Sequence, residues 1–129
     1  MTDDPLWPRA AAWPSTESGA ADVAIVGVPT HLTSISPTGA HATPAAIRAA
    51  LTRYSTYSWS HDIDLASIVA RDGGDVLNPD GDEGIARVVE RTSELAAHTR
   101  LLIALGGDNS LTYSVALGVW GERLPSAGL

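Results

Sequence analysis

Three short apolar runs, separated by segments of helical pattern, constrain the fold of this chain more than any other feature. Residues 23–28 and 101–105 are continuously apolar, and residues 66–70 form a weaker run. A run of this length that is apolar on both faces is typical of a strand inside a parallel sheet. The order strand, helix, strand, helix, strand, helix therefore predicts an α/β fold built on an open parallel sheet with right-handed crossovers.

Apolar residues at helical spacing predict three helices. The first is expected to have Thr43 as its N-cap and Pro44 at its first position, with an apolar stripe that extends to Tyr54. The second is expected over about 85–96, and the third begins near Ser110. The first strand and the first helix are joined by a long loop rich in Ser, Thr, Pro and Gly, and loops of this kind often carry binding sites.

The segment before the first strand differs in composition from the rest. Residues 1–21 contain three prolines, and prolines at this spacing prevent a helix from continuing. We therefore expect an N-terminal extension at 1–21 that contains Pro and Trp, with Trp7 and Trp13 attaching it to the domain surface. The α/β domain itself is expected at 22–129.

Charge and composition exclude several classes of protein. All eight basic residues are scattered arginines, 15 carboxylates outnumber them, and the net charge is -7, so a nucleic-acid binder with a basic patch is excluded. The chain has no cysteine, which excludes disulfides and thiolate metal sites. Its apolar runs are far shorter than the roughly 18 residues that span a bilayer, and its start is acidic rather than signal-like. A cytoplasmic protein without membrane contact is expected.

Chemically useful side chains follow each predicted strand. Ligands bind at the carboxyl ends of the strands of an open α/β sheet. That rule selects the loop at 29–42, the acidic turn at 72–75 and the Gly-rich turn at 106–110. The candidate residues at this rim are Asp72, Asp75, Gly106, Gly107 and Asp108, together with Asn109 and His41.

These residues allow three interpretations. The glycines can serve only to make sharp turns, and the aspartates can serve only as caps. Two carboxylates with a third oxygen or nitrogen ligand can instead hold Mn²⁺ or Mg²⁺. A Gly-rich turn that opens a helix can also bind an anion, but the aspartates would repel phosphate and no phosphate-binding motif is present. Metal is therefore favoured over phosphate, and the four scattered histidines form no zinc motif.

Three motifs, in order, resemble the ureohydrolase family, which includes arginase, agmatinase and formimidoylglutamase. Residues 39–48 are similar to the family's Gly…Pro-x-x-Ile-Arg helix start, and residues 72–76 are similar to its Asp-x-Gly-Asp-Val. Residues 105–112 are similar to its Gly-Gly-Asp-His-Ser block. The resemblance covers about residues 22–120, and the amino-acid sequence at 36–41 is most similar to formimidoylglutamase-like members.

The resemblance implies a doubly wound α/β fold, of which this chain holds about the first three strand–helix units, and an oligomeric protein. It also implies two Mn²⁺ ions bridged by a hydroxide, which attacks the carbon of a guanidinium or formimino group and releases urea or formamide. The substrate implied is a small amidine or guanidino compound. No catalytic residue is assigned to this chain.

Two departures from the family pattern stand out. Asn109 occupies the position of the family's His metal ligand, and an amide oxygen is a poorer ligand than imidazole for a transition metal. The family's other ligands come from an Asp-x-His-x-Asp block, which this chain lacks, and from a later Asp-x-Asp block. Weak or absent Mn²⁺ binding is therefore expected.

We expect the chain to be the N-terminal part of a ureohydrolase-like hydrolase of linear C–N bonds, from a truncated or split gene, and to be inactive by itself. One alternative is a non-catalytic interaction subunit, completed by a second chain that carries the missing half. Another is a small anion- or nucleotide-binding α/β module. Either a homo-oligomer or a complex with that second chain is expected.

Overall fold

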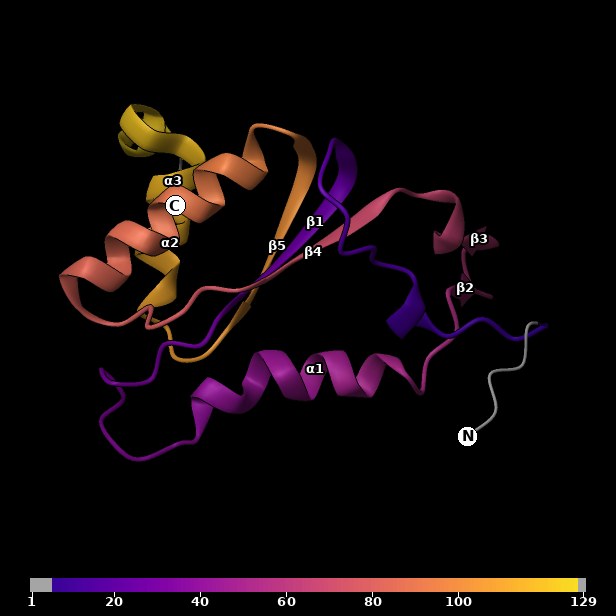
Figure 1. The fold of residues 1–129 in the computed structure, drawn as a ribbon, viewed down its shortest axis with the longest axis horizontal. Helices are drawn as coiled ribbons and strands as arrows, with labels where there is room; N and C mark the ends of the chain where they lie inside the picture. The colour runs from indigo at the N-terminus through magenta and orange to yellow at the C-terminus, as the bar shows by residue number, and fades with distance from the viewer. Residues whose placement is uncertain (1–5, 128–129) are drawn as a thin grey trace.

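The computed structural model describes residues 6–127, and a three-stranded parallel sheet forms its centre. Its strands are β1 (Ala21–Val28), β4 (Ala70–Asp75) and β5 (Thr99–Gly106), in the order β4-β1-β5 (Figure 1). A central strand needs apolar side chains on both faces, and the last six residues of β1 are all buried. The predicted parallel sheet is confirmed.

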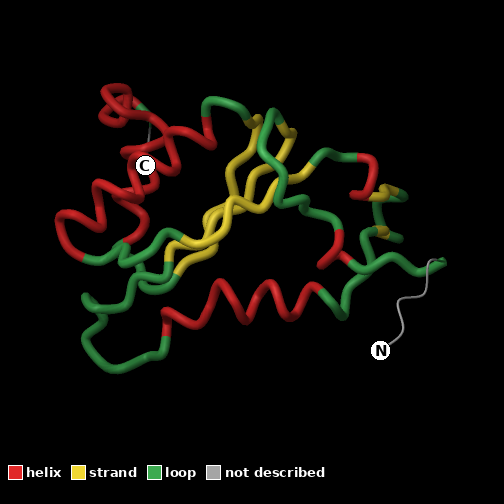
Figure 2. Tube along the Cα trace, viewed as in Figure 1, coloured by secondary structure: helices red, strands yellow, loops and turns green. Residues whose placement is uncertain are grey.

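Helices cover both faces of this sheet. Helix α1 (Thr43–Leu51) lies on one side, and α2 (Gly81–Ala96) and α3 (Leu111–Trp120) lie on the other (Figures 1 and 2). The larger core lies on the side of α2 and α3. Its buried members are Val26, Val28, Val76 and Val88.

Short elements complete the described chain. A two-stranded antiparallel sheet joins β2 (Tyr57–Ser58) to β3 (Ile63–Asp64), and sequence periodicity did not predict it. Four 3₁₀ helices lie at Ala10–Ala12, Ala40–Ala42, Leu65–Ser67 and Gly121–Ser126. No helix among residues 6–127 is both long and apolar enough to cross a membrane.

The predicted second strand at 66–70 is wrong in position. Asp64 accepts a hydrogen bond from the Ala66 amide at 2.9 Å, which caps the 3₁₀ helix there, and β4 begins only at Ala70. The polar sequence that follows becomes a strand because its backbone pairs with β1 on its inner side. Tertiary pairing overrides weak strand propensity here.

The first helix and the N-terminal extension also differ from expectation. Helix α1 begins at Thr43, with Ala42 rather than Thr43 as its N-cap, and Tyr54 lies beyond its end. In the extension, the indole of Trp13 donates to the Ile68 carbonyl at 2.9 Å. Trp7 instead is more than half exposed. Residues 1–5 of the predicted extension lie outside the described residues.

Helices α2 and α3 cross at a point where a glycine is required. A Cβ built on Gly118 would lie 1.9 Å from the Thr92 hydroxyl oxygen and 2.8 Å from the Val89 carbonyl oxygen. Thr92 is itself fully buried and donates to the Val88 carbonyl at 2.8 Å. The backbone of α3 therefore packs directly on a buried hydroxyl of α2.

Gly118→Ala is expected to destabilise the protein even though alanine is the better helix former. Helix propensity favours alanine by about 1 kcal/mol, but overpacking at a crossing costs about 1–3 kcal/mol. The unfolding free energy is therefore expected to fall by up to about 2 kcal/mol. Urea denaturation measures the difference. Tyr113→Ala, at an exposed position of the same helix, is the control and changes little. An increase in stability for Gly118→Ala would contradict the packing described.

Candidate functional site

The carboxyl ends of the three parallel strands meet at one rim of the sheet. Residues 29–39 leave β1 as a long loop, residues 76–80 follow β4, and residues 107–110 join β5 to α3. Figure 1 shows these connections at the same end of the strands. The rim that the strand order predicts is therefore present, and the side chains on it can be placed.

The Gly-rich turn after β5 packs tightly against the loop after β1. The Gly107 amide donates to the Val28 carbonyl at 3.1 Å, and the Asp108 amide donates to the Thr30 carbonyl at 2.8 Å. A Cβ on Gly107 would lie 1.9 Å from the Thr30 oxygen, and one on Gly106 would lie 2.1 Å from the Leu111 side chain. Gly107 is therefore required by the close approach of the Thr30 backbone, whereas at Gly106 a side chain would have to displace the tip of Leu111.

The carboxylate of Asp108 holds the loop in place. Its Oδ2 accepts from the hydroxyls of Thr33 at 2.9 Å and Ser34 at 3.2 Å. Its Oδ1 accepts from the hydroxyl of Ser110 at 2.5 Å and from the Ser110 amide at 3.1 Å. The hydrogen bond from the Ser110 hydroxyl is the largest cause that lowers the pKa of Asp108, and hydrogen bonds from Thr33 and Thr30 lower it further. Desolvation raises this pKa, but the net effect is a pKa far below the usual value of an aspartate.

Asp72, in the middle of β4, and Asp75, at its end, share one arginine. Arg48, on α1, donates to Asp72 through Nε at 2.6 Å and through Nη2 at 2.8 Å. Its Nη1 donates to Asp75 at 2.5 Å. The side chains of Arg48 and Asp72 are 26% and 18% exposed, so the pair is largely withdrawn from water. We call these three residues the Arg48 clamp; it joins α1 to β4.

The clamp changes the acid–base properties of its members. Burial by itself raises the pKa of Asp72, but hydrogen bonds from Arg48 and from the Gly74 amide, together with the charge of Arg48, outweigh it. The net effect is a lowered pKa for Asp72. The hydrogen bond to Asp72 is the largest cause that raises the pKa of Arg48, against desolvation, so the guanidinium stays charged.

A histidine pair lies beside the clamp in an open cavity of about 360 Å³. The rings of His31 and His41 have centroids 4.8 Å apart. Asp80 accepts from the His31 and Leu32 amides at 3.1 and 3.0 Å, and its other oxygen lies 3.3 Å from Nδ1 of His31. Asp75 also lines this cavity. His41 therefore lies at the rim, in the same cavity as Asp75.

The rim residues of the described chain do not fit a pair of Mn²⁺ ions. Asn109 is exposed, and its Oδ1 accepts from the Thr112 hydroxyl at 3.0 Å. The carboxylate of Asp72 already accepts hydrogen bonds from Arg48. The carboxylate of Asp108 already accepts hydrogen bonds from three hydroxyls. Across residues 6–127, no group of three His, Asp or Glu side chains is arranged to hold a metal ion.

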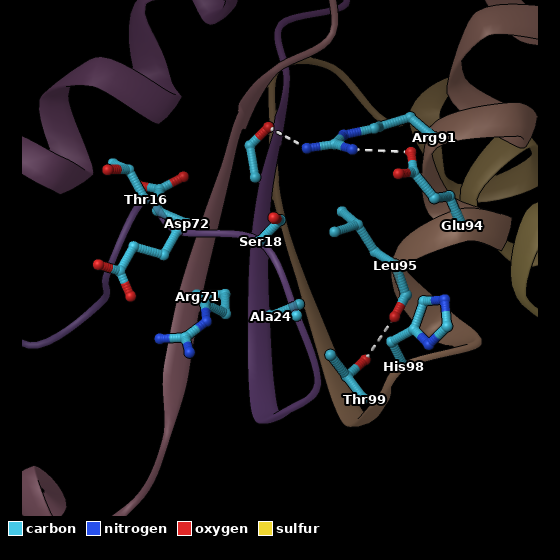
Figure 3. Close-up of a pocket in the computed structure, with 13 residues that line it drawn as sticks. Thr16, Ser18, Ala24, Arg71, Asp72, Arg91, Glu94, Leu95, His98 and Thr99 are labelled. Atoms are coloured by element: carbon cyan, nitrogen blue, oxygen red, sulfur yellow. Dashed lines mark hydrogen bonds and ion pairs between the residues drawn. The ribbon is translucent and has the colours of Figure 1, made fainter.

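A second cavity lies away from the rim, near the start of β5, and Figure 3 shows its lining. Its volume is about 130 Å³. Arg91 donates to the Gly73 carbonyl at 2.8 Å and to Glu94 at 2.7 Å, and Thr99 donates to the Leu95 carbonyl at 2.9 Å. The bonds to Gly73 and from Thr99 tie α2 to the sheet, which is a structural role.

Sequence reasoning missed the residues that hold the rim aspartates. Arg48 lies within the motif at 39–48, but nothing in its spacing indicates that it contacts residues 24 and 27 positions later. Thr33, Ser34 and Asp80 were likewise only part of a polar loop or turn. Proximity of this kind depends on the fold.

Comparison with known proteins identifies the family. A family model described as "Arginase family" matches residues 21–125, which is most of the chain. The chain belongs to the arginase family. Comparison with solved structures also finds the fold that the motif resemblance implies.

Relatives of this arginase-family chain are longer than it is. It is 36% identical over 93 residues to a formimidoylglutamase of Halalkalibacterium halodurans, covering 69% of this chain and 29% of the relative. It is 36% identical over 103 residues to an agmatinase of Pyrococcus horikoshii, covering 78% of this chain and 36% of the relative. The chain thus spans about a third of the length of these curated relatives.

Solved structures also resemble this chain in fold. The formimidoylglutamase of Bacillus subtilis superposes with a TM-score of 0.81 and 26% identity, covering 92% of this chain and 39% of that one. Proclavaminate amidino hydrolase of Streptomyces clavuligerus superposes with a TM-score of 0.75 and 25% identity, covering 89% and 40%. Trypanosoma cruzi formiminoglutamase has been solved with Mn²⁺, both as such and as an asparagine-to-histidine variant.

Arg48→Gln is expected to lower the unfolding free energy by about 1–3 kcal/mol at pH 7, because it leaves the largely buried carboxylate of Asp72 and the more exposed one of Asp75 without their charged partner. The lowered pKa of Asp72 means that the clamp's contribution is present above the carboxyl's unfolded pKa and is lost as pH falls through its folded pKa. The difference from wild type therefore shrinks below about pH 4.

Urea denaturation at pH 7 and pH 3 tests this expectation. Arg53→Gln is the matched control, because Arg53 is exposed and follows the same helix. Equal losses for the two variants, or a loss that does not depend on pH, would contradict the clamp.

Asp108→Ala is expected to loosen the rim loop while leaving the sheet intact. The hydroxyls of Thr33 and Ser34 lose their acceptor, so amide exchange across residues 30–38 should accelerate about tenfold, which corresponds to roughly 1.4 kcal/mol of local opening. Hydrogen–deuterium exchange with peptide resolution measures it. Asn109→Ala, one position further, serves as the control and should leave that loop protected.

Proposed function

We propose that residues 21–125 form the first part of a Mn²⁺-dependent ureohydrolase domain that hydrolyses a linear C–N bond in a formimino or guanidino compound. The observation that carries this proposal is the likeness to formimidoylglutamase in both sequence and structure, over 69% and 92% of the chain. A formimino compound is the favoured substrate class because formimidoylglutamases of two organisms are among the curated relatives.

In this proposal, the chain supplies the rim and not the complete metal site. The Arg48 clamp fixes the end of β4 against α1, and Asp108 fixes the loop after β1 against the turn after β5. These contacts shape one wall of a substrate pocket. Two Mn²⁺ ions, which would activate water in the whole domain, would need ligands from outside the described residues, and Asn109 would offer only a neutral amide oxygen at the rim.

The proposal predicts that residues 21–125 can replace the corresponding segment of the H. halodurans formimidoylglutamase. The chimera is expected to release formamide from formiminoglutamate when Mn²⁺ is supplied, because the rim contacts described above are internal to the segment. The 129-residue chain alone is expected to release no formamide from formiminoglutamate under the same conditions, and no urea from agmatine or arginine.

An Asn109→His version of the chimera refines the same experiment. Imidazole is the better ligand for a transition metal, so the Mn²⁺ concentration that gives half-maximal activity should fall. A folded chimera that binds Mn²⁺ but hydrolyses none of the three compounds would contradict the proposed function. Activity of the isolated chain would contradict the assignment of the metal ligands.

A further inference from the structure

An arginine without a counter-charge lines the second cavity. Arg71 is half-buried, and its Nε is buried and has no hydrogen-bond partner among residues 6–127. Within the same range, its guanidinium forms no ion pair. The chain has 15 carboxylates and eight arginines, so carboxylates are not in short supply. Leaving a buried, charged donor unpaired costs free energy, and this cost would be removed by an external acceptor.

Small residues beside Arg71 create the space. On β4, Arg71 pairs with Ala24 of β1, and the position of Gly73 shares the face of Arg71 because side chains alternate along a strand. A Cβ on Gly73 would lie 3.0 Å from the Leu95 side chain and 3.1 Å from Nη2 of Arg91, so this face is the one that α2 covers. Larger residues in place of Ala24 and Gly73 would fill the cavity, whose volume is about 130 Å³.

The N-terminal segment forms one wall of this cavity. Two backbone hydrogen bonds, at 3.0 and 2.8 Å, hold Ser15 against the outer edge of β4, beside Arg71. Because β1 lies on the inner side of β4, residues 16–20 have to cross β4 to reach it (Figure 3). Thr16 and Ser18, which carry hydroxyl groups, therefore line the cavity.

The carboxylates around the cavity do not neutralise its guanidinium. Asp72 belongs to the Arg48 clamp, and the carboxylate of Glu94 accepts a hydrogen bond from Arg91 at 2.7 Å. Glu17 is exposed and forms no ion pair among residues 6–127. Two of the three lining carboxylates thus already have an arginine partner, and none of the three is paired with the guanidinium in the cavity.

We propose that this cavity, which we call the Arg71 site, binds a small tetrahedral oxyanion such as inorganic phosphate. The planar guanidinium of Arg71 donates to two oxygens of the anion, a geometry that phosphate matches. The hydroxyls of Thr16 and Ser18 donate from the N-terminal segment. The bound anion thereby joins β4 to this segment.

The size of the cavity and the arrangement of its lining favour this class of ligand. A volume of about 130 Å³ corresponds to roughly four water molecules, which is too little for a nucleotide. Figure 3 shows Arg71 on the β4 side of the cavity and His98 on the opposite side, with Ser18 between them. A tetrahedral anion presents oxygens in several directions, whereas a carboxylate presents its two oxygens in one plane.

The Arg71 site is separate from the proposed hydrolytic function. It lies near the start of β5, whereas the rim lies at the carboxyl ends of the strands. All of its lining residues belong to the described part of the chain. No step of the proposed hydrolysis uses it, so either proposal can fail without the other.

Thermal denaturation of the 129-residue chain in sodium phosphate, sodium acetate and sodium chloride of equal ionic strength tests the site. A ligand that binds only the folded state stabilises it, so the melting temperature is expected to rise by about 5 °C when phosphate is at about ten times its dissociation constant. Acetate and chloride are expected to have smaller effects. Hydrogen–deuterium exchange in phosphate should show protection at residues 16–20 and none in the rim loop at 30–38.

Arg71→Gln is expected to weaken phosphate binding at least about tenfold in isothermal titration, because it removes a charged donor. Arg53→Gln is the matched control, since Arg53 is exposed and lies outside the cavity. Without phosphate, Arg71→Gln is expected to be no less stable than wild type in urea, because the donor that it removes has no partner.

Glu17→Gln provides a test that keeps Arg71 in place. Glu17 is exposed, so its replacement does not threaten folding. It is the lining carboxylate without an arginine partner, so its neutralisation is expected to strengthen phosphate binding by reducing repulsion. This variant remains informative even where Arg71→Gln does not fold.

Four results would overturn the proposal. The first is a rise in melting temperature that chloride or acetate reproduces, and the second is phosphate binding that Arg71→Gln leaves unchanged or Arg53→Gln weakens equally. The third is weaker binding in Glu17→Gln. The fourth is exchange protection in the loop at 30–38 instead of at residues 16–20.

Discussion

The fold depends on the burial of the last six residues of β1 between two parallel neighbours. Its backbone groups bond to β4 on one side and to β5 on the other, and its side chains supply both apolar layers. Every functional feature follows from this position. The loop that leaves β1 has to pass between the ends of its neighbours, where Asp108 on one side and Asp80 on the other accept its hydrogen bonds.

Elements formed by local interactions could be predicted from the sequence, whereas elements that depend on tertiary contacts could not. The strand at 101–105 and the turn at 106–110 were predictable because apolar continuity and glycine act locally. Residues 70–75 were placed wrongly because a polar sequence forms a strand only when a neighbour pairs with it. The small β2–β3 sheet was missed for the same reason, since each of its strands has two residues.

The candidate site shows the same division. Motif order predicted Asp72, Asp75, Asp108 and His41 near the carboxyl ends of the strands. Asp75 ends β4, Asp108 follows β5 and His41 lines a cavity with Asp75, whereas Asp72 lies in the middle of β4 opposite Ile25. Motif order could not show that the guanidinium of Arg48, rather than a cation from solution, lies between Asp72 and Asp75. That contact joins residues on different elements, and it exists only after α1 packs on the sheet. Family membership is clear from the motifs, whereas the metal-binding role of Asn109 stays a prediction.

The Arg48 clamp gives this part of the rim an internal counter-ion. Carboxylates gathered at one edge repel each other, and a protein that relied on a bound cation to offset that repulsion would change shape with metal supply. Here a covalently attached charge, which cannot dissociate or lose its proton at physiological pH, occupies that place between Asp72 and Asp75. The end of β4 therefore needs no bound metal ion to offset the repulsion between these two carboxylates.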